Sequence, residues 1–231
     1  MPLTTEQALA KVGLLHARLS ARRPEIAKLD AYFRGDHRLT FASPEWAKVH
    51  QDRYRGFSDN WCGVVGSAPG ERTELNGFRL GDDTDVLSDD ERMLWNDWEY
   101  NDGPAQSSQG FLASSVSKRS SVLVWGNDDD EPVMTWEHPA QVIVDYDPAA
   151  PRVRRYALKA WVEDERECAT LYTPDEVWKF QRSAVLGSSI GGRTAGGLIV
   201  PASIAGWTGG GWVPRQDEDD TWPIANPMGR V

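Results

Sequence analysis

The sequence predicts an α+β fold in which N-terminal helices are followed by an antiparallel β meander. Over roughly the first 120 residues, apolar side chains recur at intervals of three and four, which is typical of amphipathic helices. From residue 121 onward, short alternating runs rich in β-branched and aromatic residues are separated by turn-forming residues, which indicates strands. A glycine-rich segment at about 183–211, with nine glycines between 187 and 211, predicts a long mobile loop.

The N-terminal segment predicts a pair of helices. The first covers about residues 5–22, where Thr4 and Gln7 form a capping box. The second begins at Pro24, a residue that fits a first helical turn, and ends at Gly35. The apolar sides of the two helices consist of Leu9, Val12, Leu15 and Leu19, and of Ile26, Leu29, Tyr32 and Phe33.

The stretch YFRGDHRL, residues 32–39, contains an Arg-Gly-Asp tripeptide. Receptor recognition through this tripeptide requires a protruding hairpin in a secreted protein, and the N-terminus lacks the apolar core of a signal peptide. We therefore interpret the stretch as a helix end, with Gly35 as the C′ glycine and Arg34 near the negative end of the helix dipole.

Further helices are expected over 44–55, 88–100 and 105–118. The clearest is 88–100, where Ser88 and Glu91 form a capping box and Met93, Leu94 and Trp98 make an apolar stripe with Trp95 near its edge. Between them, the apolar segment 60–65 is followed at once by Gly66, Pro69 and Gly70, so any helix there is short or broken.

The β-rich part contains an acidic turn at 126–131 and a tight corner, Thr-Pro-Asp-Glu, at 173–176. The predicted strands are 121–125, 132–137, 141–147, 152–162, 168–173 and 176–181, with a last strand at 212–216.

The charge of the chain argues against nonspecific DNA binding. The net charge is −10, with +4 in residues 1–55 and −14 in the remainder, so the chain as a whole does not favour nonspecific DNA binding.

No apolar run approaches the roughly 18 residues of a membrane span. A soluble, intracellular protein is expected. Cys62 and Cys168 lie in apolar surroundings and are expected to be buried, reduced thiols.

Each motif that suggests a binding or catalytic site lacks a residue or a spacing that the site requires. Residues 187–194, GSSIGGRT, match a phosphate loop except that Arg193 replaces the lysine, and the glycines and proline that follow make the required helix improbable. The acidic segment 127–131 lacks the ligand spacing of a calcium loop. The histidines, which are His16, His37, His50 and His138, show no zinc spacing. We expect no catalytic, cofactor-binding or metal-binding residues, no cofactor and no enzymatic activity.

The chain contains 11 tryptophans. They favour either core packing or a binding surface for glycans or partners. Core positions are expected for Trp61, Trp95, Trp98, Trp136, Trp161 and Trp178, whereas partly exposed positions or contacts with a neighbouring subunit are expected for Trp207, Trp212 and Trp222.

Several segments, in their order and spacing, resemble the N-terminal half of a tailed-phage portal protein of the SPP1-like type found in actinobacteriophages. They are LDAYFRGDHRL (29–39), NWCGVV (60–65), ERTELNGFRL (71–80), LWNDWEYND (94–102), SVLVWGN (121–127), MTWEHPAQVIVDYDP (134–148), LKAWVEDERECATLYTPDEVWKFQR (158–182) and WPIANPMGRV (222–231). The resemblance covers nearly the whole chain. Here the segment at 63–76 departs from the family, which usually continues as an unbroken helix.

The resemblance implies a portal-wing-like fold, with residues 1–120 as its mainly helical part and 121–231 as its β-rich part. The family's stem, clip, tunnel loop and crown are absent, so we expect a truncated or split portal subunit. The family implies a homo-oligomeric ring, usually a dodecamer, at a capsid vertex of the virion. Its partners would be capsid and scaffolding proteins, terminase, a head–tail adaptor and DNA that passes through without sequence-specific binding. Assembly would take place in the host cytoplasm. The alternative is a tryptophan-rich module that binds glycans or cell walls.

Overall fold

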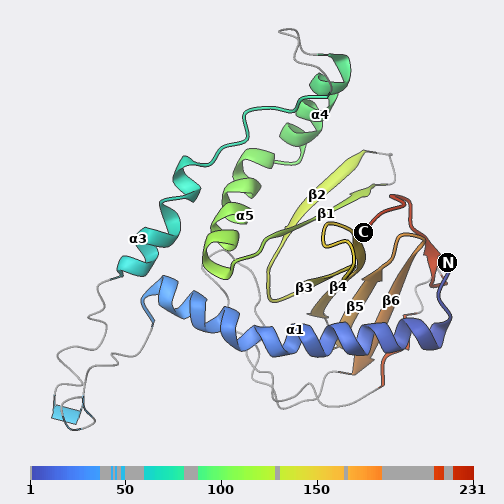
Figure 1. Cartoon of the computed structure of the whole chain (residues 1–231), viewed down its shortest axis with the longest axis horizontal. Coiled ribbons are helices and arrows are strands. Elements are labelled where there is room, and N and C mark those ends of the chain that lie inside the picture. The colour runs from blue at the N-terminus through green and yellow to red at the C-terminus, as the bar shows by residue number, and fades with distance from the viewer. Residues whose placement is uncertain are drawn as a thin grey trace. The chain divides into compact units, whose positions relative to one another are not determined.

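The computed structural model (Figure 1) describes residues 2–36, 43, 45, 48–49, 60–80, 88–127, 131–163, 166–183, 211–215 and 221–231. Its helices precede a set of antiparallel strands, which confirms the predicted α+β class. The predicted glycine-rich loop at about 183–211, apart from its two end residues, and most of the predicted helix at 44–55 lie outside the described residues.

The chain forms two compact units. The first, which we call the sheet unit, contains Met1–Pro24, Leu123–Val133 and Glu137–Val231. The second, which we call the helical unit, contains Glu25–Val122 and Met134–Trp136. The long first helix and the hairpin that follows the last helix contribute residues to both units.

Helix α1 (Thr5–Arg34) is a single helix of 30 residues, so the prediction of two helices separated at Pro24 is wrong. Pro24 has no N–H to donate to the carbonyl of Ser20, but the side chains on either side of it hold the helix in place. Arg23 Nε donates a hydrogen bond of 2.9 Å to the carbonyl of Ala140, and Ile26 is buried. Packing of these side chains therefore overrides the local preference of proline.

The end of α1 confirms the sequence prediction. Gly35 has a φ of +77°, the left-handed conformation that favours glycine. The amide of Gly35 donates to the carbonyl of Tyr32 (3.2 Å), and the amide of Asp36 donates to the carbonyl of Ala31 (2.8 Å). Together these bonds make a Schellman motif. The Arg-Gly-Asp tripeptide thus belongs to a helix cap.

The helical unit contains α3 (Trp61–Ser67), the short 3₁₀ turn η1 (Gly70–Arg72), α4 (Asp89–Tyr100) and α5 (Gly103–Ser117). The last two confirm the helices predicted over 88–100 and 105–118. The seven-residue α3 confirms that a helix after residue 60 is short.

The start of α4 is held by the capping box that the sequence predicts. Ser88 Oγ accepts from the amide of Glu91 (3.2 Å), and Glu91 Oε2 accepts from the amide of Ser88 (2.8 Å). The other oxygen of Glu91 accepts from the amide of Leu80 (2.7 Å), which belongs to the extended segment before α4. One carboxylate therefore fixes both the helix start and the segment that precedes it.

Glycine allows close packing of aromatic rings in the helical unit. A Cβ added to Gly103 would lie 2.3 Å from the indole of Trp98, and one added to Gly110 would lie 2.0 Å from the indole of Trp136. The two indoles meet edge to face, with ring centroids 5.4 Å apart. Phe78 packs edge-on against Trp98, at 6.0 Å. These rings form the packed centre of the helical unit.

The strands occupy two sheets in the described chain. A two-stranded sheet pairs β1 with β2, and a six-stranded sheet has the order β3-β4-β5-β6-β7, with β8 also paired to β6. The strand pairs of the larger sheet are all antiparallel in the described part of the chain. The bounds are β1 Ser121–Gly126, β2 Pro132–Glu137, β3 Val142–Tyr146, β4 Arg154–Glu163, β5 Arg166–Tyr172, β6 Glu176–Ser183, β7 Val213–Pro214 and β8 Ile224–Ala225.

The six longer strands and β7 match the predicted runs, and the meander is divided between two sheets. The corner at 173–176 is confirmed, because the amide of Thr173 donates to the carbonyl of Glu176 (2.9 Å). Strand β8 has no counterpart among the predictions, since a two-residue strand leaves no alternating pattern.

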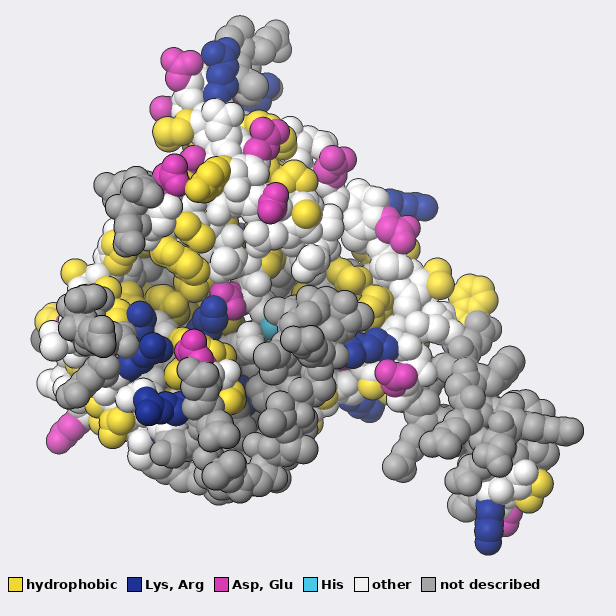
Figure 2. All heavy atoms as spheres, turned by 180° about the vertical axis from the view of Figure 1, so that it is seen from behind, with side chains coloured by type: hydrophobic (Ala, Val, Ile, Leu, Met, Phe, Trp, Pro, Cys, Tyr) yellow, Lys and Arg dark blue, Asp and Glu magenta, His cyan; other side chains and the backbone are white. Residues whose placement is uncertain are grey.

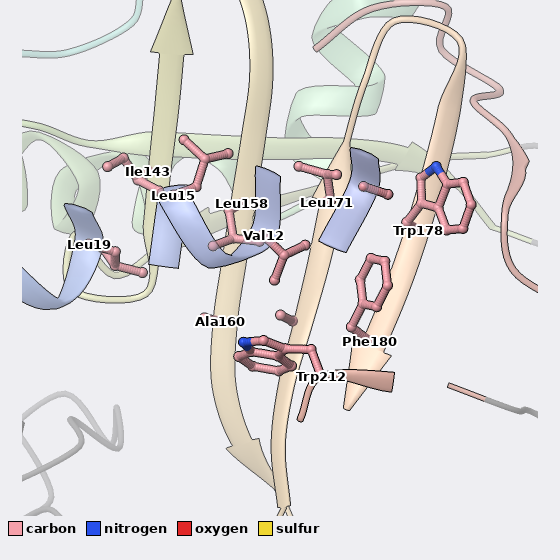
Figure 3. Packing of buried hydrophobic residues seen from close by; sticks show 12 residues of the cluster. Val12, Leu15, Leu19, Ile143, Leu158, Ala160, Leu171, Trp178, Phe180 and Trp212 are labelled. Carbon is pink, nitrogen blue, oxygen red and sulfur yellow. The ribbon is translucent and has the colours of Figure 1, made fainter. Parts of the chain in front are cut away.

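The core of the sheet unit lies between the first part of α1 and one face of the larger sheet. Figure 3 shows Val12, Leu15 and Leu19 of α1 pointing at residues of the strands. The side chains buried there are Ala8, Val12, Leu15, Leu19, Ile143, Leu158, Ala160, Ala169, Leu171, Trp178, Phe180 and Trp212. Burial of this apolar surface is the main force that holds the unit together.

Candidate interaction surface

Helix α3 is fixed at its start by Asn60. The side-chain Oδ1 of Asn60 accepts from the amide of Gly63 (2.9 Å), as expected of an N-cap residue. Its Nδ2 donates to the carbonyl of Phe33 near the end of α1 (2.8 Å). One side chain therefore caps α3 and ties it to the preceding helix within the helical unit.

The inner side of α3 consists of glycine. A Cβ added to Gly63 would lie 3.0 Å from the carbonyl oxygen of Phe33, and one added to Gly66 would lie 3.0 Å from the Phe33 ring and 3.5 Å from Val116. The glycines at these two positions, three residues apart on one side of the helix, let α3 approach α1 and α5 closely.

The outer side of α3 is apolar and exposed. The exposed fractions are 65% for Trp61, 59% for Val64 and 70% for Val65. We call these three residues, together with the exposed Cys62, the neutral face. Figure 2 shows hydrophobic side chains at the molecular surface in this region. An ordinary surface helix buries its apolar side, so α3 has the reverse arrangement.

Charge is absent from this part of the helical unit. Residues 60–70, which contain α3, and residues 103–117, which contain α5, have no Lys, Arg, Asp or Glu. About a quarter of the whole chain is charged, at 26%. Depletion of charged residues, together with exposed aromatic side chains, is the composition found at the centres of protein interfaces.

The sheet unit has a different distinctive feature, a cluster of ionisable groups buried at one end of the core. His16 and Arg23 come from α1, and Glu167 and Arg182 come from directly paired positions on β5 and β6. Glu167 and Arg182 lie on the sheet face that packs against α1, because residues two apart on a strand share a face and Ala169 and Phe180 belong to the core. Arg182 forms an ion pair with Glu167, and its guanidinium carbon lies 4.4 Å from the centre of the Trp212 ring.

Burial changes the protonation of this cluster. Loss of hydration and, to a smaller extent, the charges of Arg23 and Arg182 lower the pKa of His16 to about 3. Burial also lowers the pKa of Arg23 to about 10 and raises the pKa of Glu167 against the opposing effect of its ion pair. At neutral pH, His16 is therefore uncharged, and Trp212 contacts both the His16 ring and the Arg182 guanidinium.

A second set of ionisable groups lies on the opposite face of the sheet. Lys159 Nζ and Glu137 Oε1 are 2.6 Å apart, and the Glu137 carboxylate is largely buried. Burial, reinforced by this carboxylate, raises the pKa of Tyr172 to about 12. The phenol is thus fully protonated at neutral pH, and the arrangement is that of a structural ion pair.

The tryptophan predictions are confirmed in part. Trp98 and Trp178 are buried, as predicted, and the half-buried ones are Trp95, Trp136 and Trp161. Trp61 is exposed, so its predicted core position is wrong, because the glycine side of α3 faces inward instead. Trp222 is partly exposed as predicted, with Lys179 Nζ 4.2 Å from its ring centre.

The expected exposure of Trp212 is also wrong, since it is 8% exposed and belongs to the core. Trp207 lies outside the described residues. Cys168 is a buried free thiol as predicted, but Cys62 is an exposed one. The predicted burial of Cys62 is wrong for the same reason as that of Trp61, because the glycine side of α3 faces inward.

The weak motifs gain no support as sites. His138 Nδ1 accepts from the amide of Ala140 (3.1 Å), and His37, His50 and the segment 187–194 lie outside the described residues. The described part of the chain holds no group of three His, Cys, Asp or Glu side chains suited to a metal ion. It likewise has no helix long and apolar enough to cross a membrane.

The family model of phage portal proteins of the SPP1 Gp6-like type matches residues 14–192, a range that includes α3 and most of the core residues of the sheet unit. This chain belongs to that portal family. The family is one of structural, non-enzymatic bacteriophage proteins.

The portal protein of Mycobacterium phage L5 is a relative of this chain. The two are 31% identical over an alignment of 116 residues, which covers 46% of this chain and 23% of the phage L5 protein. The match thus spans about a quarter of the length of the curated relative. The family resemblance seen in the sequence is thereby confirmed.

Proposed function

We propose that the chain is a structural subunit of a phage portal ring at a capsid vertex. The observation that carries this proposal is the match of the portal family model over residues 14–192. In this role the subunit would take part in genome packaging, genome ejection, terminase docking and the head–tail connection, and would catalyse no reaction itself. Residues 1–120 and 121–231 would form the helical and β-rich parts of the portal wing.

The partners follow from this role. They would be other portal subunits in a ring, the major capsid and scaffolding proteins, the large terminase subunit and a head–tail adaptor. DNA would pass through the ring without sequence-specific binding. The net charge of −10 supports this, because an acidic surface does not retain a phosphate backbone. The protein would assemble in the host cytoplasm and reside in the virion.

The alternative function, glycan binding through tryptophans, has little support in the described structure, although Trp61 is exposed. That function requires exposed tryptophan rings that present flat faces to sugar rings. Trp98, Trp178 and Trp212 are instead buried, and the parallel rings of Trp178 and Phe180 stack inside the core.

The experiment that tests the portal role is localisation in phage particles. The gene is tagged in the phage or prophage that encodes it, particles are purified, and the chain is quantified by mass spectrometry and located by immunogold electron microscopy. We expect label at a single vertex and a copy number far below that of the major capsid protein. Absence from the particles, or label spread over the whole capsid, would overturn the proposal.

A further inference from the structure

The apolar side chains of α3 face outward, and packing within a single chain does not explain this orientation. A helix that served only to pack against α1 and α5 would place its apolar residues inward. Here Gly63 and Gly66 face inward, whereas Trp61, Val64 and Val65 face outward. No residue of α3 is buried. The spacing of the outer residues, at i, i+3 and i+4, is that of an apolar stripe suited to a partner.

We propose that the neutral face, formed by Trp61, Cys62, Val64 and Val65, is the surface through which one copy of this chain contacts a neighbouring copy. This inference rests on the proposed function, since a portal ring requires each subunit to touch two neighbours. In a ring the contact is heterologous, so the neutral face meets a different surface of the next copy.

The charge distribution favours a second copy as the occupant. Every copy carries a net charge of −10, so the net electrostatic interaction between two copies is repulsive. The uncharged segments 60–70 and 103–117 provide a surface where this repulsion is smallest. An exposed tryptophan followed one helical turn later by two exposed valines supplies the kind of anchor that dominates the binding energy of protein interfaces.

Other classes of partner fit this surface poorly. Nucleic acid requires Lys or Arg to neutralise phosphates, and residues 60–70 contain neither. An amphipathic helix that lies on a membrane combines its apolar side with a basic polar side. Helix α3 has seven residues and no basic side chain. Its chemistry is thus that of a protein–protein contact.

Cys62 allows a direct test with the unaltered sequence. It is exposed and adjacent to Trp61, whereas Cys168, the other cysteine of the chain, is 4% exposed. A benzophenone maleimide therefore reacts selectively at Cys62 under native conditions. Full-length labelled chain is mixed with an equal amount of full-length ¹⁵N chain, irradiated, digested and analysed by mass spectrometry.

We expect crosslinked peptides that combine a ¹⁴N peptide containing Cys62 with a ¹⁵N peptide from the second copy. The identity of the ¹⁵N peptide then gives the complementary surface. Crosslinks confined to peptides of the same isotope overturn the proposal, because they mean that the neutral face is covered by the chain's own residues. The absence of any crosslink between copies also overturns it.

Charged variants give an independent measurement. Val65→Glu places a carboxylate on the neutral face, and Met93→Glu places one on α4 at a residue of similar exposure, 56%. In sedimentation equilibrium we expect Val65→Glu to weaken self-association by about tenfold or more, whereas Met93→Glu leaves it nearly unchanged. Circular dichroism confirms that both variants are folded. Equal self-association of both variants and the unaltered chain contradicts the proposal.

The failure of this inference is distinguishable from failure of the portal role. If Val65→Glu still enters phage particles at the normal copy number, the neutral face is not the subunit contact, and the portal role remains. If the unaltered chain is missing from particles, the portal role fails, while the isotope crosslinks still report whether copies meet through α3.

Discussion

Gly110 of α5 lies directly against the indole ring of Trp136, so closely that an added Cβ would fall 2.0 Å from Cδ1 and Nε1 of the ring. The ring cannot move aside freely, because its edge contact with Trp98 holds it on the other side. We therefore expect Gly110→Ala to destabilise the helical unit by about 1–3 kcal/mol through overpacking. Chemical denaturation followed by tryptophan fluorescence measures this change.

The control for this substitution is Gly13→Ala. Gly13 is also inside a helix, but nothing lies within 4 Å of a Cβ added there. In the absence of a clash, alanine stabilises a helix interior by about 1 kcal/mol relative to glycine. The two substitutions should therefore have opposite signs. A stabilising effect of Gly110→Ala would show that the close contact with Trp136 does not exist in solution.

The buried His16 predicts a dependence of stability on pH. Its pKa is about 3 in the folded chain and near 6.5 when exposed. Below pH 6.5 the unfolded chain takes up a proton that the folded chain does not, so stability falls as the pH falls from about 6.5 to 3. The slope is at most about 1.4 kcal/mol per pH unit. Glu167 contributes with the opposite sign, because burial raises its pKa.

A variant isolates the contribution of His16. We expect His16→Gln to be less stable at pH 7 but to lose less stability than the unaltered chain between pH 6.5 and pH 4. Val12→Ala, a cavity-forming change on the same buried stripe of α1, should lower stability while keeping the original slope. Urea unfolding at several pH values measures both. An unchanged slope for His16→Gln contradicts the lowered pKa.

Glu91 predicts a local effect on amide exchange. Its two carboxylate oxygens accept from the amides of Leu80 and Ser88, and these bonds lower its pKa. Glu91→Gln leaves one oxygen for two amides, so we expect faster hydrogen exchange at Leu80 or Ser88. Because its pKa is lowered, this contribution is present above about pH 4.5 and is lost as the pH falls below it.

Asp90→Asn is the matched control for Glu91→Gln. It also removes one negative charge from the first turn of α4, but the Asp90 side chain is exposed. Both changes weaken the interaction with the helix dipole equally. Only Glu91→Gln should therefore alter exchange at Leu80. Equal exchange in the two variants would mean that the carboxylate does not bridge the two segments.

The helix cap at Gly35 is expected to be sensitive to substitution of this glycine. Its φ of +77° lies in the region that a β-branched residue rarely adopts. We expect Gly35→Val to destabilise the protein by about 1–2 kcal/mol and Gly35→Asn to cost less, since asparagine tolerates this conformation. Thermal or chemical denaturation separates the two. Equal stability of Gly35→Val and the unaltered chain would refute the cap.

The regular elements were predictable because their signals are local. The capping box at Ser88, the C′ glycine at Gly35 and the alternation of the strands each depend on a few neighbouring residues. The continuity of α1 through Pro24 was not predictable in this way. It depends on Arg23, whose partner Ala140 lies far away in the sequence.

The interaction surface was harder to predict than the fold. Periodicity places Trp61 and Val65 on an apolar stripe but does not say whether that stripe faces inward. The presence of Gly63 and Gly66 on the other side was the available signal. For the ionic cluster, the signal was Arg23, a charged residue on the same stripe as the buried Leu19.

The position of Trp212 has a consequence for synthesis on the ribosome. Helix α1 leaves the ribosome well before β6 and Trp212, which belong to the core that covers it. The nascent α1 must therefore remain without its full covering until Trp212 has been synthesised, a state prone to aggregation. Any translation product that stops before Trp212 leaves one end of this core open to water.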